Sequence, residues 1–316
     1  MARRNADGFM ANCQEIEATY DWLDRFQELR LGKFADITAA FFDGDFSKTL
    51  DQAQKDKHAW VFEGLRVGGP GKRVLDIGCG WGPILAALKV AGSVGVGLTL
   101  SGAQVAYCRA NGLDAKLIDW KEATPGDLGA FDGVVSIGAF EHFCSEDEYN
   151  AGRQEEIYGR FFDLCAAVLP VGGRLYLQKM VWGKAVPVSR EIRLDAAEGT
   201  PQRILARLRK MYPGSWLPNG RDQIVAAAAG HFALIKSNNG RKDYIETLDR
   251  WGEGNDSLWT LGKIFRFLPA LAGLLPRYLT NRDFRVQIES ILKNDQQRCF
   301  IDEIMTHERL FFAKTA

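Results

Sequence analysis

The chain has 316 residues, of which 46% are hydrophobic and 25% are charged, the composition of an ordinary folded protein. Its 40 Lys and Arg residues balance its 40 Asp and Glu residues, so it lacks the basic excess of a dedicated nucleic-acid-binding protein. No apolar stretch reaches the roughly 18 residues of a membrane span, the N-terminus lacks the apolar core of a signal peptide, and the cysteines include no CxxC pair, so we expect a cytoplasmic protein without a metal site.

The first 70 residues predict helices around one loop. Apolar residues recur at helical spacing over residues 14–30, and residues 34–46 form an aromatic loop. Thr49 and Gln52 fit a capping box that begins a helix ending near Leu65. The glycine-rich residues 68–71 then break the chain before the next element.

Between residues 73 and 180, short buried strands alternate with helices. Because parallel strands need crossover connections, this alternation predicts an α/β fold with a doubly wound, mostly parallel, Rossmann-like sheet. The expected strands are residues 73–77, 93–98, 115–119, 131–137 and 174–180, and the expected helices begin at Pro83 and Ser101 or cover residues 153–169.

The rest of the chain has a mainly helical pattern. Residues 181–230 and 238–306 are expected to be mostly helical, with late strands at residues 232–236 and 309–313. We expect the helical segments to form a cap, or lid, over the carboxyl edge of the sheet, where open α/β sheets bind their ligands.

The strongest local signal is the segment 74–82, Val-Leu-Asp-Ile-Gly-Cys-Gly-Trp-Gly. A strand here enters a glycine-rich turn and then a helix, which allows backbone N–H groups to approach a ligand, although a plain tight turn has the same pattern. A dinucleotide site would have GxGxxG spacing and an acid after the second strand. The sequence has Gly78, Gly80 and Gly82 and no acid within residues 98–101, so a nicotinamide site is disfavoured.

Several segments together resemble the cyclopropane-fatty-acid synthase and mycolic-acid methyltransferase family. They are residues 76–82, 97–104 (Gly-Leu-Thr-Leu-Ser-Gly-Ala-Gln), 136–143 (Ser-Ile-Gly-Ala-Phe-Glu-His-Phe), 212–218 and 244–251. The resemblance extends from about residue 20 to the end and implies a class I methyltransferase that uses S-adenosylmethionine. It divides the chain into an N-terminal helical segment with a cofactor-covering loop (1–70), a cofactor-binding core (71–180), a helical substrate cap (181–306) and a terminal strand (307–316).

The resemblance also implies which residues hold the cofactor. Asp76 and the turn after it would hold the methionine part, Thr99 and Gln104 the ribose hydroxyls, and Trp120 the adenine. Gln104 also fits a capping box with Ser101, and Trp120 could instead be a core tryptophan. The complete set is Thr38, Asp76, Gly78, Cys79, Gly80, Thr99, Leu100, Gln104, Asp119, Trp120 and Ile137.

Glu141 is the leading catalytic candidate, because it follows the fourth strand at the edge where a ligand would lie. Methyl transfer to an alkene leaves a carbocation, and a carboxylate about 4 Å away stabilises it by roughly 4 kcal/mol at an effective dielectric constant near 20. Glu141 could instead cap a helix or pair with a local base. Tyr244 resembles the active-site tyrosine of the family, or it packs an amphipathic helix. His142 is expected to be structural.

The sequence departs from the family at two positions. Family cyclopropane synthases hold a bicarbonate ion, whose ligands include a cysteine in the N-terminal loop and a histidine on the fifth strand. The matching positions are Ala39 and Gln178, so Gln178 completes the candidate catalytic set while bicarbonate binding and ring closure are in doubt. Methyl transfer does not require that ion, and a methyl-branched or methylene product could form.

We therefore predict C-methylation of an unsaturated fatty acyl or related lipid chain. The apolar residues 257–276 could line an acyl tunnel, contact the inner face of a membrane or pack the cap itself. Nearby basic residues could meet a phosphate or an acyl carrier, or simply face solvent, and the chain could form an oligomer. They are Arg277, Arg282, Arg285 and Lys293. The alternatives are N- or C-methylation of a small metabolite or isoprenoid, and a ligand-binding protein without turnover.

Overall fold

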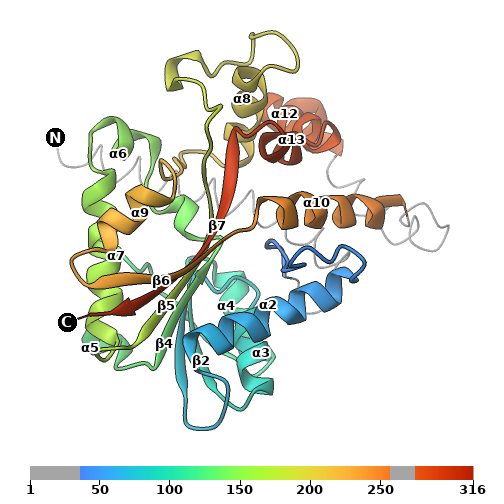
Figure 1. The fold of residues 1–316 in the computed structure, drawn as a ribbon. Coiled ribbons are helices and arrows are strands. Elements are labelled where there is room, and N and C mark those ends of the chain that lie inside the picture. Colours follow the sequence, from blue (N-terminus) through green and yellow to red (C-terminus); the bar gives the residue numbers. More distant parts are fainter. Residues whose placement is uncertain (1–35, 257–274, 316) are drawn as a thin grey trace.

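The computed structural model describes residues 36–256 and 275–315. A seven-stranded sheet runs through them in the order β3-β2-β1-β4-β5-β7-β6 (Figure 1). Strands β1 to β5 are parallel, whereas β7 runs antiparallel between β5 and β6, which confirms the predicted doubly wound, mostly parallel sheet. The strands are β1 (Arg73–Ile77), β2 (Val94–Thr99), β3 (Asp114–Leu117), β4 (Gly133–Ile137), β5 (Arg174–Trp182), β6 (Phe232–Asn239) and β7 (Met305–Lys314).

Helices flank the sheet and extend beyond its carboxyl edge (Figure 1). Two short 3₁₀ turns, η1 (Phe140–His142) and η2 (Ser189–Glu191), interrupt the connections. The described α-helices are α2 (Leu50–Leu65), α3 (Pro83–Val90), α4 (Gly102–Ala110), α5 (Pro125–Leu128), α6 (Glu146–Asn150), α7 (Gln154–Val168), α8 (Pro201–Met211), α9 (Arg221–Ala228), α10 (Arg241–Asp256), α12 (Arg282–Leu292) and α13 (Asp295–Ile301).

Local sequence signals fix the beginnings of two helices where they were predicted. The Thr49 side chain caps α2 by accepting a hydrogen bond from the backbone N–H of Gln52 at 3.2 Å, and Arg66 ends that helix in the left-handed conformation. Pro83 is the first residue of α3, a position where its missing N–H costs no intrahelical bond.

Hydrophobic layers cover both faces of the sheet, as parallel strands require. On one face α7 packs Phe161 and Phe162 into a large aromatic and aliphatic core. On the other face α2 contributes Val61, which packs with Tyr176 of β5 and Phe311 of β7. The sheet is therefore a rigid platform from which loops at the carboxyl edge can position side chains.

The cap is formed by α8, α10, α12 and α13 (Figure 1). Helices α8, α10 and α13 share a separate hydrophobic core, and α12 packs against α8 and α13. A buried ion pair joins two of these helices: Asp295 of α13 accepts hydrogen bonds from Nε and Nη2 of Arg207 of α8, at 2.6 and 2.8 Å. The segment predicted as a cap also contains α9, which packs beside α7 and β6 in the sheet layer.

The prediction of a mostly helical segment 181–230 was wrong for its first part. Strand β5 continues to Trp182, and residues 183–200 contain η2 but no α-helix. Pro187 and the glycines at 183 and 199 disfavour a continuous helix. The backbone instead extends the sheet, since the N–H of Gly183 bonds to the carbonyl of Ile304 at 2.9 Å.

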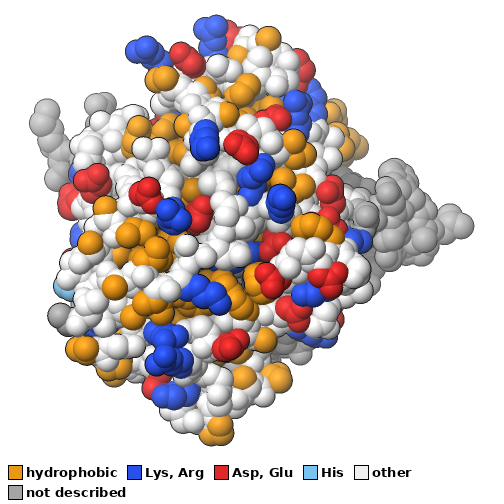
Figure 2. Space-filling view, viewed as in Figure 1, with side chains coloured by type: hydrophobic (Ala, Val, Ile, Leu, Met, Phe, Trp, Pro, Cys, Tyr) orange, Lys and Arg blue, Asp and Glu red, His pale blue; other side chains and the backbone are white. Residues whose placement is uncertain are grey.

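The predicted helix 14–30 and most of the apolar segment 257–276 lie outside the described residues. Within the described ranges, no helix is long and apolar enough to cross a membrane. On the face shown in Figure 2, basic and acidic side chains both occur across the surface with hydrophobic side chains between them, in keeping with the balanced composition.

Candidate active site

A cavity of about 1080 Å³ lies at the carboxyl edge of the sheet, beneath the cap. Every residue predicted to bind the cofactor or to act in catalysis lines this cavity, so the structure brings the whole predicted set together. These residues are Thr38, Asp76, Gly78, Cys79, Gly80, Thr99, Leu100, Gln104, Asp119, Trp120, Ile137, Glu141, Gln178 and Tyr244.

The glycine-rich turn after β1 forms one wall of the cavity. Gly78, Gly80 and Gly82 have φ angles of 87°, 52° and 79°, in the region that favours glycine. A Cβ atom on Gly78 would lie 2.2 Å from the Cβ of Ala139, so only glycine lets the turn pack against the end of β4. At Gly80 nothing lies within 4 Å of such an atom, so a ligand can approach the backbone there.

Asp76 is a buried carboxyl group at the end of β1. It lines the cavity although it is only 2% exposed. Burial raises its pKa to about 8, and the negative charge of Asp36 adds to the effect. A cationic ligand beside Asp76 would favour the ionised form, so this position suits a positively charged group.

Thr99 and Gln104 form a polar pair at the end of β2. The Thr99 hydroxyl donates to Oε1 of Gln104 at 2.5 Å, and the Ser101 hydroxyl caps α4 by accepting from the backbone N–H of Gln104 at 3.3 Å. The cap uses the backbone of Gln104 and leaves its side chain at the cavity, so the two predicted roles are compatible.

Trp120 belongs to both the cavity wall and the hydrophobic core. Its ring centroid lies 4.7 Å from that of Phe143 and 5.5 Å from that of Phe161, and it also lines the cavity. Its neighbour Asp119 accepts a hydrogen bond from the backbone N–H of Lys121 at 2.9 Å, which fixes the loop after β3.

Glu141 lies on η1, directly after β4, and is 2% exposed. Its Oε1 accepts a hydrogen bond from the backbone N–H of Met180 at 2.7 Å, and its Oε2 is buried without a hydrogen-bond partner among the described residues. Burial raises the pKa of Glu141 to about 7, against the opposing effect of the Met180 hydrogen bond. Ser145, not Glu141, caps the next helix.

Lys179 lies close behind Glu141 in the interior. It is fully buried, its Nζ has no hydrogen-bond partner in the described part of the chain, and it lies 5.1 Å from the ring centroid of Phe140. Burial lowers the pKa of Lys179 to about 7, while Glu141 opposes this shift. The two buried groups therefore change charge in the same pH range.

Tyr244 reaches the cavity from α10 in the cap. Its hydroxyl accepts a hydrogen bond from Nε2 of Gln296 at 3.0 Å, and its ring packs against Phe300 and His307 with centroid distances of 4.7 and 5.1 Å. Burial raises the pKa of Tyr244 well above its usual value, so the phenol stays protonated.

Gln178 joins the sheet to the N-terminal loop. Its Nε2 donates to the carbonyl oxygen of Ala39 at 2.9 Å, and its Oε1 accepts from the hydroxyl of Tyr176 at 2.8 Å. The two positions at which the sequence departs from the family that it resembles are thus in direct contact.

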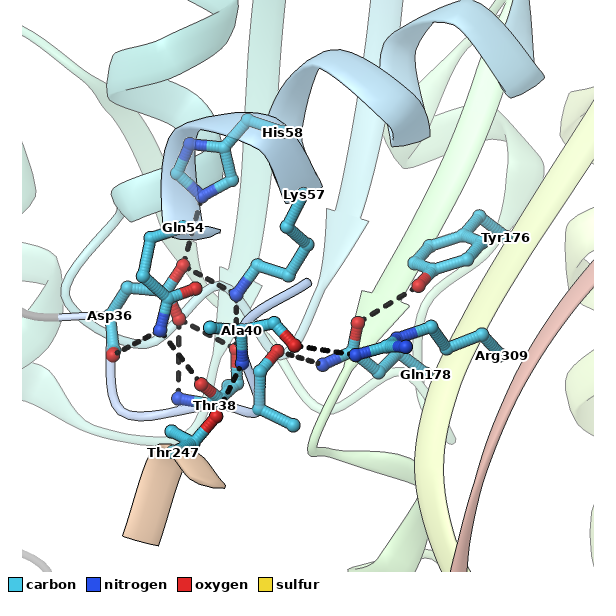
Figure 3. A network of polar contacts seen from close by, with 11 residues as sticks. Asp36, Thr38, Ala40, Gln54, Lys57, His58, Tyr176, Gln178, Thr247 and Arg309 are labelled. Atoms are coloured by element: carbon cyan, nitrogen blue, oxygen red, sulfur yellow. Dashed lines mark hydrogen bonds and ion pairs between the residues drawn. The ribbon is translucent and has the colours of Figure 1, made fainter. Parts of the chain in front are cut away.

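Residues 36–40 form a loop that closes one side of the cavity, and α2 anchors its beginning (Figure 3). The carboxylate of Asp36 pairs with Lys57 at 2.7 Å and His58 at 2.9 Å. Lys57 also donates to the Thr38 hydroxyl at 2.6 Å. Burial acts to raise the pKa of Asp36, but Lys57 and His58 outweigh it and hold that pKa well below its usual value.

The end of the same loop is anchored by the sheet and the cap (Figure 3). Nη2 of Arg309 on β7 donates to the carbonyl oxygen of Ala40 at 2.6 Å, and the hydroxyl of Thr247 on α10 accepts from the N–H of Ala40 at 3.0 Å. Contacts from α2, β5, β7 and α10 therefore converge on one short loop.

Several lining residues were not predicted as site residues: Asp36, Met180, Tyr212, Gln296 and His307. Met180 and His307 lie on strands that were predicted, and side chains alternate between the two faces of a strand. The face of the sheet on which each side chain lies could therefore have been deduced from the sequence. His142 also lines the cavity; its Nδ1 lies 2.7 Å from the Ser215 hydroxyl, and burial lowers its pKa to about 4.

Comparison with known proteins gives consistent matches. The family model described as mycolic acid cyclopropane synthetase matches residues 9–260. The chain is 30% identical over 255 residues to the S-adenosylmethionine-dependent methyltransferase UmaA of Mycobacterium tuberculosis, covering 75% of this chain and 80% of that protein. It is 28% identical over 254 residues to cyclopropane mycolic acid synthase 2 of Mycobacterium leprae, covering 75% and 78%.

Solved structures share the fold. The cyclopropane synthase MmaA2 from Mycobacterium tuberculosis superposes with a TM-score of 0.71 at 23% identity, covering 96% of this chain and 98% of that chain. The mycolic acid cyclopropane synthase CmaA1, complexed with SAH and CTAB, has a TM-score of 0.71 at 24% identity with the same coverage.

Proposed function

This chain belongs to the mycolic acid cyclopropane synthetase family and is an S-adenosylmethionine-dependent methyltransferase, and we propose that it methylates a carbon of an unsaturated acyl or related lipid chain. The observation that carries the proposal is Glu141, whose buried Oε2 lacks a hydrogen-bond partner among the described residues and which lines the same cavity as the glycine-rich turn. A cation-stabilising carboxylate is what methylation of an alkene requires.

The residues present fit S-adenosylmethionine. The open backbone at Gly80 and the buried carboxyl of Asp76 provide a cradle and a counter-charge, and Thr99 and Gln104 provide uncharged hydrogen-bonding groups. We propose that these residues hold the methionine and ribose parts while Trp120 contacts the adenine. When bound there, the cofactor supplies an electrophilic methyl group.

Glu141 would act on the charge that appears on the acceptor. Its Oε1 is fixed by Met180, so Oε2 is held in place before the reaction and needs no reorganisation. At about 4 Å a carboxylate stabilises a carbocation by roughly 4 kcal/mol. Because burial raises the pKa of Glu141 to about 7, a nearby cation also shifts the group to its charged form.

The size and lining of the cavity support a lipid acceptor. Its volume of about 1080 Å³ lies at the upper end of the usual range for ligand pockets, which leaves room for an acceptor beside a cofactor. Apolar side chains of Ile37, Ile137, Phe143 and Met180 lie along it. Relatives named for action on mycolic acids favour the same class of acceptor.

The residues present fit a bound bicarbonate poorly. At the position of the family's histidine, the amide of Gln178 is already bonded to Ala39 and Tyr176. Ala39 has no side-chain group to offer an anion, and its carbonyl oxygen is the acceptor of the Gln178 bond. We therefore assign no step of the reaction to bicarbonate.

The test is transfer of a labelled methyl group. Purified protein is incubated with methyl-labelled S-adenosylmethionine and either vesicles of unsaturated phospholipid or a panel of soluble amines and isoprenoids. Label in the extracted lipid supports the proposal, whereas label confined to the aqueous products overturns it. The Glu141→Gln variant, which can still accept the Met180 hydrogen bond, serves as the matched control for catalysis.

A further inference from the structure

His307 is a buried histidine that the proposed mechanism has not used. It lies on β7 and lines the cavity although it is 2% exposed. Its Nδ1 is buried and has no hydrogen-bond partner within the described ranges. A histidine that lines a cavity can act on a ligand there through the edge of its ring that faces the cavity.

The register of the sheet places His307 beside the position where the family has its histidine. Strands β5 and β7 pair antiparallel, with Gln178 opposite Arg309 and Met180 opposite His307. Because side chains alternate between the two faces of a strand, these four residues share one face of the sheet. The imidazole missing from position 178 is thus present on the neighbouring strand, displaced by two residues.

Two neighbours hold the ring in place. Tyr244 packs against it with a centroid distance of 5.1 Å and an interplanar angle of 65°. On the other side, a Cβ atom on Gly240 would lie 2.5 Å from Nδ1, so only glycine allows the ring this position. Because Gly240 does not line the cavity, Nε2 is the ring nitrogen that can face it. Met180, which pairs with His307, also donates its backbone N–H to Glu141, so His307 lies near the proposed catalytic carboxylate.

From this placement we propose that His307 is the proton acceptor of the reaction, an inference that rests on the proposed function. The alkene π pair forms the new C–C bond as the S–CH₃ bond breaks, which leaves a carbocation on the acceptor. His307 then takes a proton from the transferred methyl carbon, whose C–H pair closes a ring, or from the adjacent carbon, whose C–H pair restores a double bond.

The charges around His307 suit this role. Burial and the positive charges of Arg309 on its own strand, Lys57 on α2 and Lys179 on β5 lower its pKa well below the usual value. The imidazole is therefore neutral and keeps a lone pair at neutral pH. A carbocation is a far stronger acid than an imidazolium ion, so it still gives up its proton, and the surrounding charges afterwards return the ring to its neutral form.

The experiment compares His307→Asn with the wild type, using methyl-deuterated S-adenosylmethionine in one run and an acceptor deuterated at its double-bond and allylic carbons in another. We expect kcat to fall by about 10²-fold, with a larger primary isotope effect in one of the two runs and an unchanged cofactor Kd. The matched variant His142→Asn, at a half-buried histidine that also lines the cavity, should show the wild-type isotope effect. Unchanged isotope effects and products in His307→Asn overturn the inference.

A second measurement needs no variant. Turnover of the wild type should be the same in bicarbonate-depleted and bicarbonate-supplemented buffer, and a large stimulation by bicarbonate overturns the inference because an external anion would then be the base. If the wild type transfers no label to lipid, the proposed function is wrong, and so is the role of His307 that rests on it. If lipid is labelled but His307→Asn behaves as wild type, the inference alone fails.

Discussion

Asp76 and Glu141 are two buried carboxyl groups that face one cavity, and both have unusual proton affinities. Burial raises the pKa of Asp76 to about 8 and that of Glu141 to about 7. Neither group has a basic side chain bonded to it among the described residues. A cavity built in this way favours cations, and both a sulfonium cofactor and a carbocation are cations.

Replacing Glu141 by Gln should remove the charge but keep the fold. Loss of roughly 4 kcal/mol of transition-state stabilisation corresponds to a fall in kcat of about three decades, while the cofactor Kd should stay within about twofold of the wild type. Single-turnover kinetics and calorimetry measure the two quantities. Glu156→Gln, an exposed change in the first turn of α7, is the control. A kcat within tenfold of the wild type would contradict the assigned role.

The affinity for S-adenosylmethionine should increase with pH. Asp76 is protonated below a pKa of about 8 in the free protein, whereas the bound cation favours its ionised form. Binding must therefore release a proton below pH 8, and Kd should fall by up to tenfold per pH unit as the pH rises towards that value, then level off. Calorimetry in buffers of different ionisation enthalpy counts the protons. Asp76→Asn should weaken the pH dependence, and a pH-independent Kd in the wild type would refute the prediction.

At the scale of elements, the loop 36–40 depends on partners far away in the sequence. The Lys57–Asp36 pair spans 21 residues and the bond from Arg309 to Ala40 spans 269. The loop has no secondary structure of its own, so these contacts and the burial of Ala39 and Ala40 hold it against the cavity. Its conformation is consequently a property of the folded sheet and of α2 rather than of its own sequence.

Lys57→Met should destabilise the protein and loosen this loop. The change leaves the buried Asp36 with His58 as its remaining ionisable partner, and breaking a buried pair costs about 3–5 kcal/mol. Denaturant unfolding should report this loss, and the cofactor Kd should rise because Thr38 loses its anchor. Lys55→Met on the same helix, where the ion pair with Asp51 is exposed, should change stability by less than about 1 kcal/mol. Equal stability of the two variants would show that the pair does not hold the loop.

The same distinction between local and distant contacts explains what the sequence could predict. The turn at Gly78 to Gly82, the cap at Thr49 and the start of α3 at Pro83 depend on neighbouring residues, and each was predicted at its observed position. Asp76, Thr99 and Glu141 lie at or just after strand ends, which converge in any parallel sheet, whereas Thr38 and Tyr244 were implied only by the resemblance. The contact of Gln178 with Ala39 and the position of His307 opposite Met180 depend on segments far apart in the sequence, so local patterns did not reveal them.

At the scale of the whole molecule, the cavity is divided between two cores. The sheet supplies Asp76 and Glu141, whereas the cap supplies Tyr244 from α10 and Gln296 from α13. We propose that residues of the sheet and its loops hold the cofactor, whereas the cap contributes Tyr244 and Gln296 to the side of the cavity that takes the acceptor. A substitution that destabilises the cap should therefore weaken acceptor binding more than it weakens cofactor binding.

Asp295→Asn tests this division. Asp295 and Arg207 are 0% and 1% exposed, and their two hydrogen bonds join α13 to α8. Loss of the charge leaves Arg207 partly uncompensated in the interior, which should cost about 3 kcal/mol in denaturant unfolding. Because Gln296 follows Asp295 directly and bonds to Tyr244, KM for the lipid acceptor should rise while the cofactor Kd stays constant. Asp283→Asn, which breaks an exposed pair between α12 and Lys210 of α8, should leave both quantities near the wild type. A rise in the cofactor Kd equal to the rise in KM would mean that sheet and cap act as one unit.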